Sequence, residues 1–138
     1  MTTFQSVHSV SKTKKLIDGL KRIIATSLDL PLVPIGNNKQ PLGDRWQQRP
    51  FTASQLIEAI EGGGVSVPIQ NKTKKIQPLG FGVITGRSVT IQGNSHFLMA
   101  LDQDGGSARR KIDELSEGRS LLKTVAFTSD RPGRCQYL

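Results

Sequence analysis

The sequence FLMALDQDGG spans residues 97–106, and the interpretation of the whole chain depends on it. Its apolar half predicts a buried strand, and the glycine pair marks the end of that strand. Because side chains alternate along a strand, Asp102 and Asp104 are expected on one face near its carboxyl end. Two carboxylates this close repel each other unless a cation or a proton lies between them. A divalent metal ion such as Mg²⁺ would satisfy both, and a pair of solvated turn residues is the alternative.

The length and composition are those of one soluble globular domain. The chain has 138 residues, of which 36% are hydrophobic and 22% charged, enough for a real core but too few for two domains of ordinary size. No apolar run approaches the roughly 20 residues of a membrane span, and the polar amino terminus lacks a signal-peptide core. With Cys135 as the single cysteine, nothing indicates a secreted, cross-linked scaffold. We therefore expect a cytoplasmic protein that does not bind a membrane.

Positive charge dominates the sequence. There are 19 Lys and Arg residues against 11 Asp and Glu, a formal net charge of +8. A surplus of this size favours polyanionic partners, nucleic acid before a membrane surface, because phosphate contacts release counterions. The basic segment at residues 71–75 is expected to be a loop that either contacts a phosphate backbone or is simply solvated.

The spacing of apolar residues predicts a mixture of helices and strands. After a flexible arm at residues 1–14, an amphipathic helix is expected over residues 15–28. A further helix over residues 53–61 begins at the helix cap Thr52. Short strands are expected over residues 32–35 and 80–86, and the polar connection at residues 87–95 is compatible with a hairpin.

The last third of the chain continues the same alternation. Ser107 is expected to cap a helix that ends near residue 116, with Ile112 and Leu115 facing inward. A strand over residues 124–128, a turn over 129–133 and a partner strand from Arg134 follow. Residues 15–138 are thus expected to form a single α/β (α+β) domain, with helices packed against a mixed sheet.

Three kinds of chemistry suit the aspartate pair to different degrees. An EF-hand calcium loop fits badly, because its fifth, sixth and twelfth positions would be Gly106, Ser107 and Asp113. A paired-carboxylate hydrolase needs its two acids in different environments, which neighbours on one strand face do not have. Two-metal phosphoryl or nucleotidyl transfer needs adjacent carboxylates in basic surroundings and therefore fits best.

At this point the sequence resembles a known family. The segments PLVPIGNNKQPLGDRWQ, GFGVITG, FLMALDQDG and TVAFTSDRPGRCQYL, in this order, resemble the amino-terminal domain of bifunctional DNA primase/polymerases. This prim-pol domain belongs to the archaeo-eukaryotic primase superfamily, and the resemblance covers residues 31–138. It implies a fold of two α/β modules, one with an RRM-like sheet that carries the catalytic carboxylates. It also implies metal-dependent addition of nucleotides to a primer, or the making of a primer, usually beside a helicase in plasmid, viral or mobile-element replication.

The resemblance also implies roles for individual residues. Asp102 and Asp104 fall on the family's metal-binding acids, which would hold Mg²⁺ or Mn²⁺, and DNA and nucleoside triphosphates would be the substrates. Cys135 or Gln136, depending on the alignment, takes the place of a nucleotide-binding histidine. Arg131 or Arg134 would then supply the positive charge for the triphosphate.

Other matches and departures complete the comparison. Lys39, Pro41 and Trp46 fall on a lysine-proline-tryptophan stretch with a mainly structural role, and Thr85 and Gly86 on a Thr-Gly turn. The family's third acidic motif has no counterpart, so we expect the domain to be incomplete at its C-terminal end. Two rivals remain: a non-catalytic nucleic-acid-binding remnant, and an interaction module in which the aspartates belong to a turn.

Overall fold

The computed structural model describes residues 7–117, 126–127 and 134–137. Contacts divide the chain into two compact units. Unit 1 comprises Met1–Ile84 and Val89–His96, and unit 2 comprises Thr85–Ser88 and Phe97–Leu138. Unit 1 combines helices with small sheets, the described part of unit 2 combines one helix with a small sheet, and every strand pair whose register is described is antiparallel. The predicted α+β class is confirmed.

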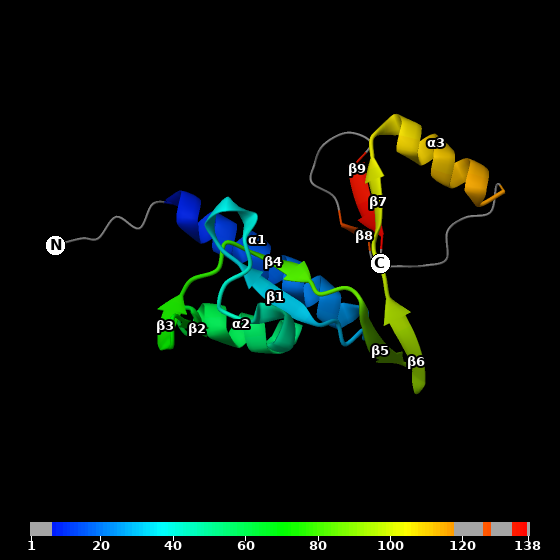
Figure 1. Ribbon diagram of the computed structural model, residues 1–138. Coiled ribbons are helices and arrows are strands. Elements are labelled where there is room, and N and C mark those ends of the chain that lie inside the picture. The colour runs from blue at the N-terminus through cyan, green and yellow to red at the C-terminus, as the bar shows by residue number, and fades with distance from the viewer. Residues whose placement is uncertain (1–6, 118–125, 128–133, 138) are drawn as a thin grey trace. The chain divides into compact units, whose positions relative to one another are not determined.

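Unit 1 is built around helix α1 (Val7–Ala25) and the strand pair β1 (Leu32–Ile35) and β4 (Gly80–Val83) (Figure 1). The helix begins eight residues before the predicted start at residue 15 and therefore includes part of the expected arm. It packs closely on β4, since a Cβ added at Gly19 would lie 3.4 Å from Phe81 Cε1. Leu20 and Ile23 are buried as the helical spacing predicts, whereas Ile24 is exposed.

Helix α2 (Ala53–Glu61) closes the core of unit 1. Its predicted bounds are confirmed, and so is its cap. The Gln55 backbone N–H donates to Thr52 Oγ1 at 3.1 Å, and the Thr52 N–H donates to Gln55 Oε1 at 2.9 Å, a reciprocal capping box. The apolar side of the helix packs against α1, and the buried apolar side chains of unit 1 include Leu20, Ile23, Leu30, Leu32, Val33, Pro34, Ala53, Leu56, Ile60, Val65, Val67 and Ile84.

The expected basic loop at residues 71–75 is wrong, because Asn71 belongs to a hairpin turn and the next four residues belong to a strand of that hairpin. Strand β2 (Val65–Ile69) pairs with β3 (Lys72–Ile76), so that Val67 opposes Lys74. The turn consists of Gln70 and Asn71, both at positive φ (51° and 63°), as two-residue hairpin turns of the I′ type require. Burial of alternate β2 residues fixes the register, and β3 is a strand through its pairing although its own side chains are mostly exposed.

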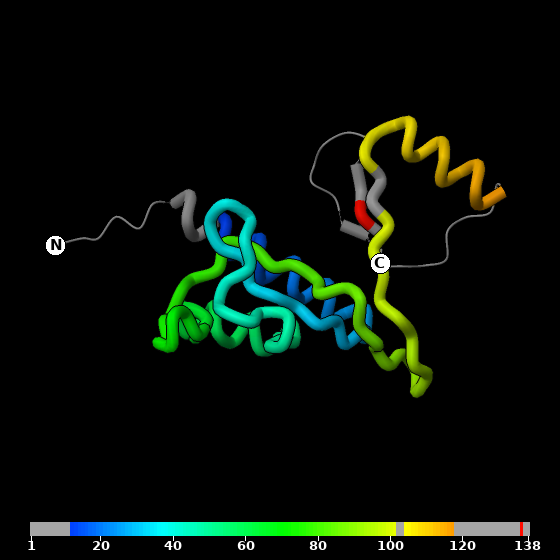
Figure 2. Tube along the Cα trace, viewed as in Figure 1, coloured from blue at the N-terminus to red at the C-terminus, as the bar shows by residue number. Residues whose placement is uncertain are grey.

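Strands β5 (Arg87–Ile91) and β6 (Asn94–Leu98) form a second hairpin. The sequence of the polar connection at residues 87–95 was compatible with such a hairpin. Its backbone can be followed in Figure 2. Its turn, Gln92 and Gly93, again has positive φ at both residues. At the open end of the hairpin, the Gly86 N–H donates to the Leu98 carbonyl oxygen at 2.9 Å.

The apolar run at residues 97–101 is not the continuous buried strand that the sequence predicts. The run is divided between β6 and β7 (Leu101–Asp104), which pair with different partners. Leu98 is buried, but Phe97 and Met99 are 64% and 68% exposed and Leu101 is 46% exposed. The apolar composition of residues 97–101 therefore predicted strand structure, but it did not predict that most of these side chains are exposed.

Unit 2 contains a three-stranded sheet in the order β7–β9–β8, beside helix α3 (Gly106–Leu115). Strands β8 (Ala126–Phe127) and β9 (Arg134–Tyr137) are described without the segment between them, so the predicted turn over residues 129–133 lies outside the described residues. The predicted partner strand from Arg134 is confirmed. Helix α3 begins at Gly106 with Gly105 as its N-cap, so the expected Ser107 cap is wrong. Ile112 is buried as predicted, whereas Leu115 is 72% exposed and not inward-facing.

Candidate functional site in unit 2

The predicted metal-binding residues lie on β7, an outer strand of the three-stranded sheet of unit 2. Asp102 and Asp104 are the second and last residues of β7, so their strand positions share one face of the sheet. The side chain of Asp104 is exposed. The predicted placement of the pair near the strand's carboxyl end agrees with the structure.

The register of β7 with β9 brings predicted nucleotide-binding residues to the same face. Asp102 pairs with Gln136, and Asp104 pairs with Arg134, in antiparallel register. Figure 1 shows β9 beside β7. Directly opposed residues of an antiparallel pair lie on one face with Cβ atoms about 4.5–5.5 Å apart. Four predicted site positions therefore form a two-by-two block on this sheet.

The same register separates Cys135 from the aspartates. Cys135 pairs with Gln103, and both positions belong to the opposite face because successive strand residues alternate. Of the two residues that the sequence left open for the place of the histidine, Gln136 is the one directly across from Asp102. The side chain of Gln136 is exposed. Arg131 lies outside the described residues.

A sharp turn connects β7 to α3 immediately after Asp104. Gly105 has φ +100° and ψ −174°, a conformation that side-chain-bearing residues rarely adopt. The Arg109 N–H donates to the Gly105 carbonyl oxygen at 3.2 Å and starts the helical hydrogen bonds. The N-terminus of α3, with its partial positive charge, thus begins two residues after Asp104. The sequence signalled the turn through its two glycines, but not which of them would cap the helix.

Two of the cations on α3 have partners within the helix. Arg109 Nε lies 3.2 Å from Asp113 Oδ1, and Lys111 Nζ lies 3.2 Å from Glu114 Oε2. These side chains are 59–70% exposed, so each pair stabilises the helix by only about 0.3–0.5 kcal/mol. Arg109 and Lys111 are therefore members of ion pairs on the surface of α3. On β9, the position of the basic residue Arg134 lies opposite Asp104.

The donor set suits a hard divalent ion. Mg²⁺ is commonly held by one or two carboxylates together with waters and substrate phosphates, and Mn²⁺ prefers the same oxygen ligands. Two aspartate positions on one face meet that requirement. Within the described residues, no three His, Cys, Asp or Glu side chains gather into a larger metal-binding group.

Sequence reasoning overlooked a hollow in unit 1. A cleft of about 560 Å³, called here the α2 cleft, lies between α2 and the β2–β3 hairpin. Its lining includes two cations, two polar groups, one acid and one aromatic ring, namely Arg49, Lys75, Gln55, Ser66, Glu58 and Phe51. No local signal revealed it, because the sequence suggested a loop where β3 supplies Lys75.

Unit 2 thus pairs a strand that carries two aspartates with a strand that carries Arg134, an arrangement compatible with a phosphoryl-transfer domain. Comparison with protein families identifies the class: residues 23–138 match the family "Bifunctional DNA primase/polymerase, N-terminal". The chain belongs to this family, and its function is of the DNA primase/polymerase type, a nucleotidyltransferase activity in replication that acts on DNA and nucleotides. Comparison with curated proteins and comparison with solved structures each found no match. In the described part of the chain, no helix is both long and apolar enough to cross a bilayer.

Proposed function

We propose that this chain catalyses metal-dependent nucleotidyl transfer, in which a primer hydroxyl attacks the α-phosphate of a nucleoside triphosphate and pyrophosphate leaves. The observation that carries the proposal is the register that sets Gln136 and Arg134 opposite Asp102 and Asp104. In a member of the prim-pol family, this block places acidic and basic positions side by side. Such neighbours are needed to hold an ion and a polyphosphate together.

Asp102 and Asp104 would hold Mg²⁺ or Mn²⁺, and the ion would supply charge stabilisation for the transferring phosphoryl group. Arg134, with Arg131 on the preceding segment, would bind the triphosphate by charge-assisted hydrogen bonds. Gln136 would donate a neutral amide hydrogen bond where the family places a histidine. The exposed side chains of Asp104 and Gln136 leave this face accessible to a nucleotide.

The biological setting belongs to the same proposal. The family resemblance suggests replication of a plasmid, phage or other mobile element, with a helicase as a partner. A cytoplasmic location remains a prediction from the sequence.

Primer extension with labelled nucleotides in Mg²⁺ or Mn²⁺ tests the chemistry. D102N and D104N should each lower incorporation by about a thousandfold or more, because metal stabilisation of the transition state amounts to several kcal/mol. D113N is the matched control: it is the same substitution on the exposed surface of α3, and it should leave incorporation unchanged. Incorporation that survives D102N and D104N would refute the proposal.

Mn²⁺ binding gives a readout independent of turnover. A ligand of the folded state raises the thermal midpoint, so Mn²⁺ should raise the midpoint of the parent and of D113N but not that of D102N. Salt-sensitive DNA binding without incorporation would favour the non-catalytic remnant. No Mn²⁺ shift at millimolar metal would favour an interaction module in which the aspartates serve as turn residues.

A further inference from the structure

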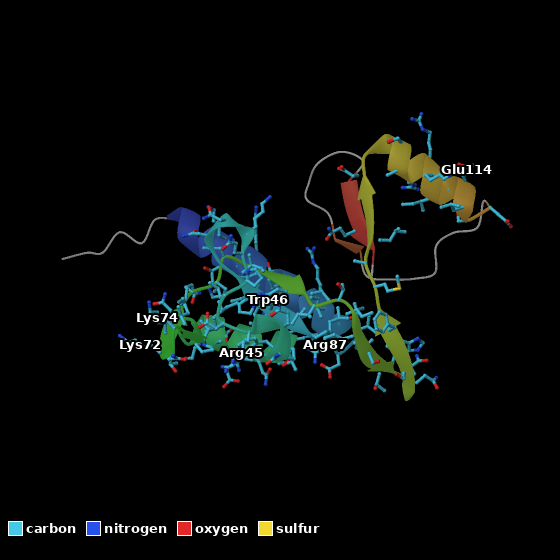
Figure 3. The ribbon with its side chains drawn as sticks, viewed as in Figure 1. Arg45, Trp46, Lys72, Lys74, Arg87 and Glu114 are labelled. Atoms are coloured by element: carbon cyan, nitrogen blue, oxygen red, sulfur yellow. The ribbon has the colours of Figure 1, made fainter. Side chains whose placement is uncertain are left out.

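The β2–β3 hairpin carries a concentration of positive charge for which the carboxylate site gives no use. Lys72, Lys74 and Lys75 occupy three of the five positions of β3, and all three are exposed. Figure 3 shows Lys72 and Lys74 extending from this strand. None of the three side chains forms an ion pair or a hydrogen bond with another described residue.

A structural reason for these lysines exists and has to be weighed. Charged side chains, lysine especially, protect an unpaired strand edge against aggregation, and β3 pairs with β2 alone among the described strands. Protection of a strand edge requires lysines along the strand, but it requires no particular residues next to them. It does not account for the cleft beside the strand or for the second cation there.

The α2 cleft places Lys75 and Arg49 in the lining of one concave surface. Lys75 pairs with Ser66, and this position lies on the face of the hairpin opposite to that of Val67 and Lys74. Its ammonium group lies near the C-terminal end of α2, since a Cβ added at Gly63 would be 3.8 Å from Lys75 Nζ. Lys72 and Lys74 occupy the other face of the same strand, so Lys75 alone of the three lines the cleft, and the other two add positive charge to β3 outside it.

The remaining lining fits an unpaired nucleotide. Phe51 provides an apolar wall, and Gln55, Glu58 and Ser66 provide hydrogen-bonding groups. A carboxylate is unfavourable next to phosphates, but it accepts hydrogen bonds from the amino groups on base edges. The faces of the bases are accessible in a single strand and are stacked against their neighbours in a duplex. The volume of about 560 Å³ is in the range of small-ligand pockets.

We propose that the α2 cleft and the lysines of β3 form a binding surface for single-stranded nucleic acid. Arg49, Lys72, Lys74 and Lys75 contact the phosphates, and one base enters the cleft. The surface lies in unit 1, whereas Asp102 and Asp104 lie in unit 2. The inference rests on the proposed function only in that a template strand is the natural ligand, since binding here requires neither a metal ion nor the aspartates.

Fluorescence anisotropy with labelled oligodeoxythymidine, performed on the full chain in EDTA at a series of salt concentrations, tests the surface. The triple variant K72Q/K74Q/K75Q should weaken binding by about tenfold to a hundredfold at 0.1 M salt. It should also lower the slope of log K against log salt by about 2, because each single-strand phosphate contact contributes about 0.7. R49Q should reduce the slope by a further amount of about 0.7.

The matched control is K14Q/K15Q/K21Q, which removes the same charge from exposed positions of α1. It should change the affinity less than about threefold, since screened distant charges contribute weakly at this salt. Equal losses in the two triple variants would overturn the proposal, and so would tighter binding of an equally long duplex or undiminished binding in K72Q/K74Q/K75Q. A purely protective role for the lysines predicts increased light scattering with unchanged DNA affinity.

Primer extension separates this inference from the proposed chemistry. If the β3 variants lose binding while incorporation in the parent does not depend on Asp102, the surface stands and the proposed chemistry fails. If D102N abolishes incorporation while the β3 variants bind normally, the chemistry stands and the surface fails.

Discussion

Gly64 should be one of the least replaceable residues of unit 1, and the substitution G64A tests why. Its φ is +141°, and a Cβ at this position would lie 2.8 Å from both the carbonyl carbon and the carbonyl oxygen of Ile76. The atoms it would meet are backbone atoms of β3, so no side-chain rotation relieves the overlap. Moving them would disturb the Val65–Ile76 end of the β2–β3 register.

The expected destabilisation by G64A is the sum of two unfavourable contributions less one favourable contribution. A side chain in a sparsely populated backbone region costs about 1–3 kcal/mol, and the overlap adds about 1–3 kcal/mol of overpacking. The smaller conformational entropy of alanine in the unfolded chain returns about 0.4–1 kcal/mol. We therefore expect G64A to lower the free energy of unfolding of unit 1 by about 1–5.6 kcal/mol.

G93A is the matched control for G64A. Gly93 also has positive φ (+78°), but nothing lies within 4 Å of its added Cβ, so only the backbone cost of about 1 kcal/mol applies. Urea unfolding followed by fluorescence of Trp46, the only tryptophan, reports on unit 1, where this residue lies in the short helix η2 (Trp46–Gln48). If G64A and G93A destabilise unit 1 equally, the close approach to Ile76 is not what requires glycine.

Two further predictions concern a cap and a register. T52A removes the acceptor for the Gln55 N–H and should lower the free energy of unfolding by about 1 kcal/mol in the same urea experiment; S54A, exposed on the same helix, should be close to neutral. Because Gln136 and not Cys135 pairs with Asp102, Q136H should raise nucleotide incorporation by about tenfold, the equivalent of one charge-assisted hydrogen bond, while C135H should not. A gain in C135H alone would contradict the β7–β9 register.

Elements whose signals are local were predictable from the sequence. Helix α2 and its Thr52 cap follow from a capping residue and an apolar stripe that lie within ten residues of each other, and both agree with the structure. The turn after Asp104 was likewise announced by its glycines. These features depend on propensities and hydrogen bonds among near neighbours, which the sequence displays directly.

Features that depend on pairing were missed or left open. The segment NKTKK has the composition of a solvated loop and becomes a strand because β2, with its buried Val65 and Val67, pairs with it. In the same way, the choice between Cys135 and Gln136 depends on the alignment of β9 with β7. A one-residue slip in either case exchanges the faces of a strand, and nothing in the local composition specifies the register. The α2 cleft escaped prediction for the same reason, since one of its cations comes from β3.

The residues of β9 that share a face with Asp102 and Asp104 depend on the β7–β9 register. Shifts of that register by odd and by even numbers of residues have different effects. A shift of β9 by one residue would move Arg134 and Gln136 to the other face of the sheet and place Cys135 opposite one of the aspartates. A shift by two residues would leave Arg134 and Gln136 on the face of the aspartates. Small insertions and deletions between β8 and β9 that shift the β7–β9 register should therefore fall into two classes, according to whether the shift is odd or even. Those that shift the pairing by an odd number would remove the basic position from the site without altering any site residue. Under the proposed chemistry, such a change in the length of the connecting segment would inactivate the domain as effectively as the loss of an aspartate.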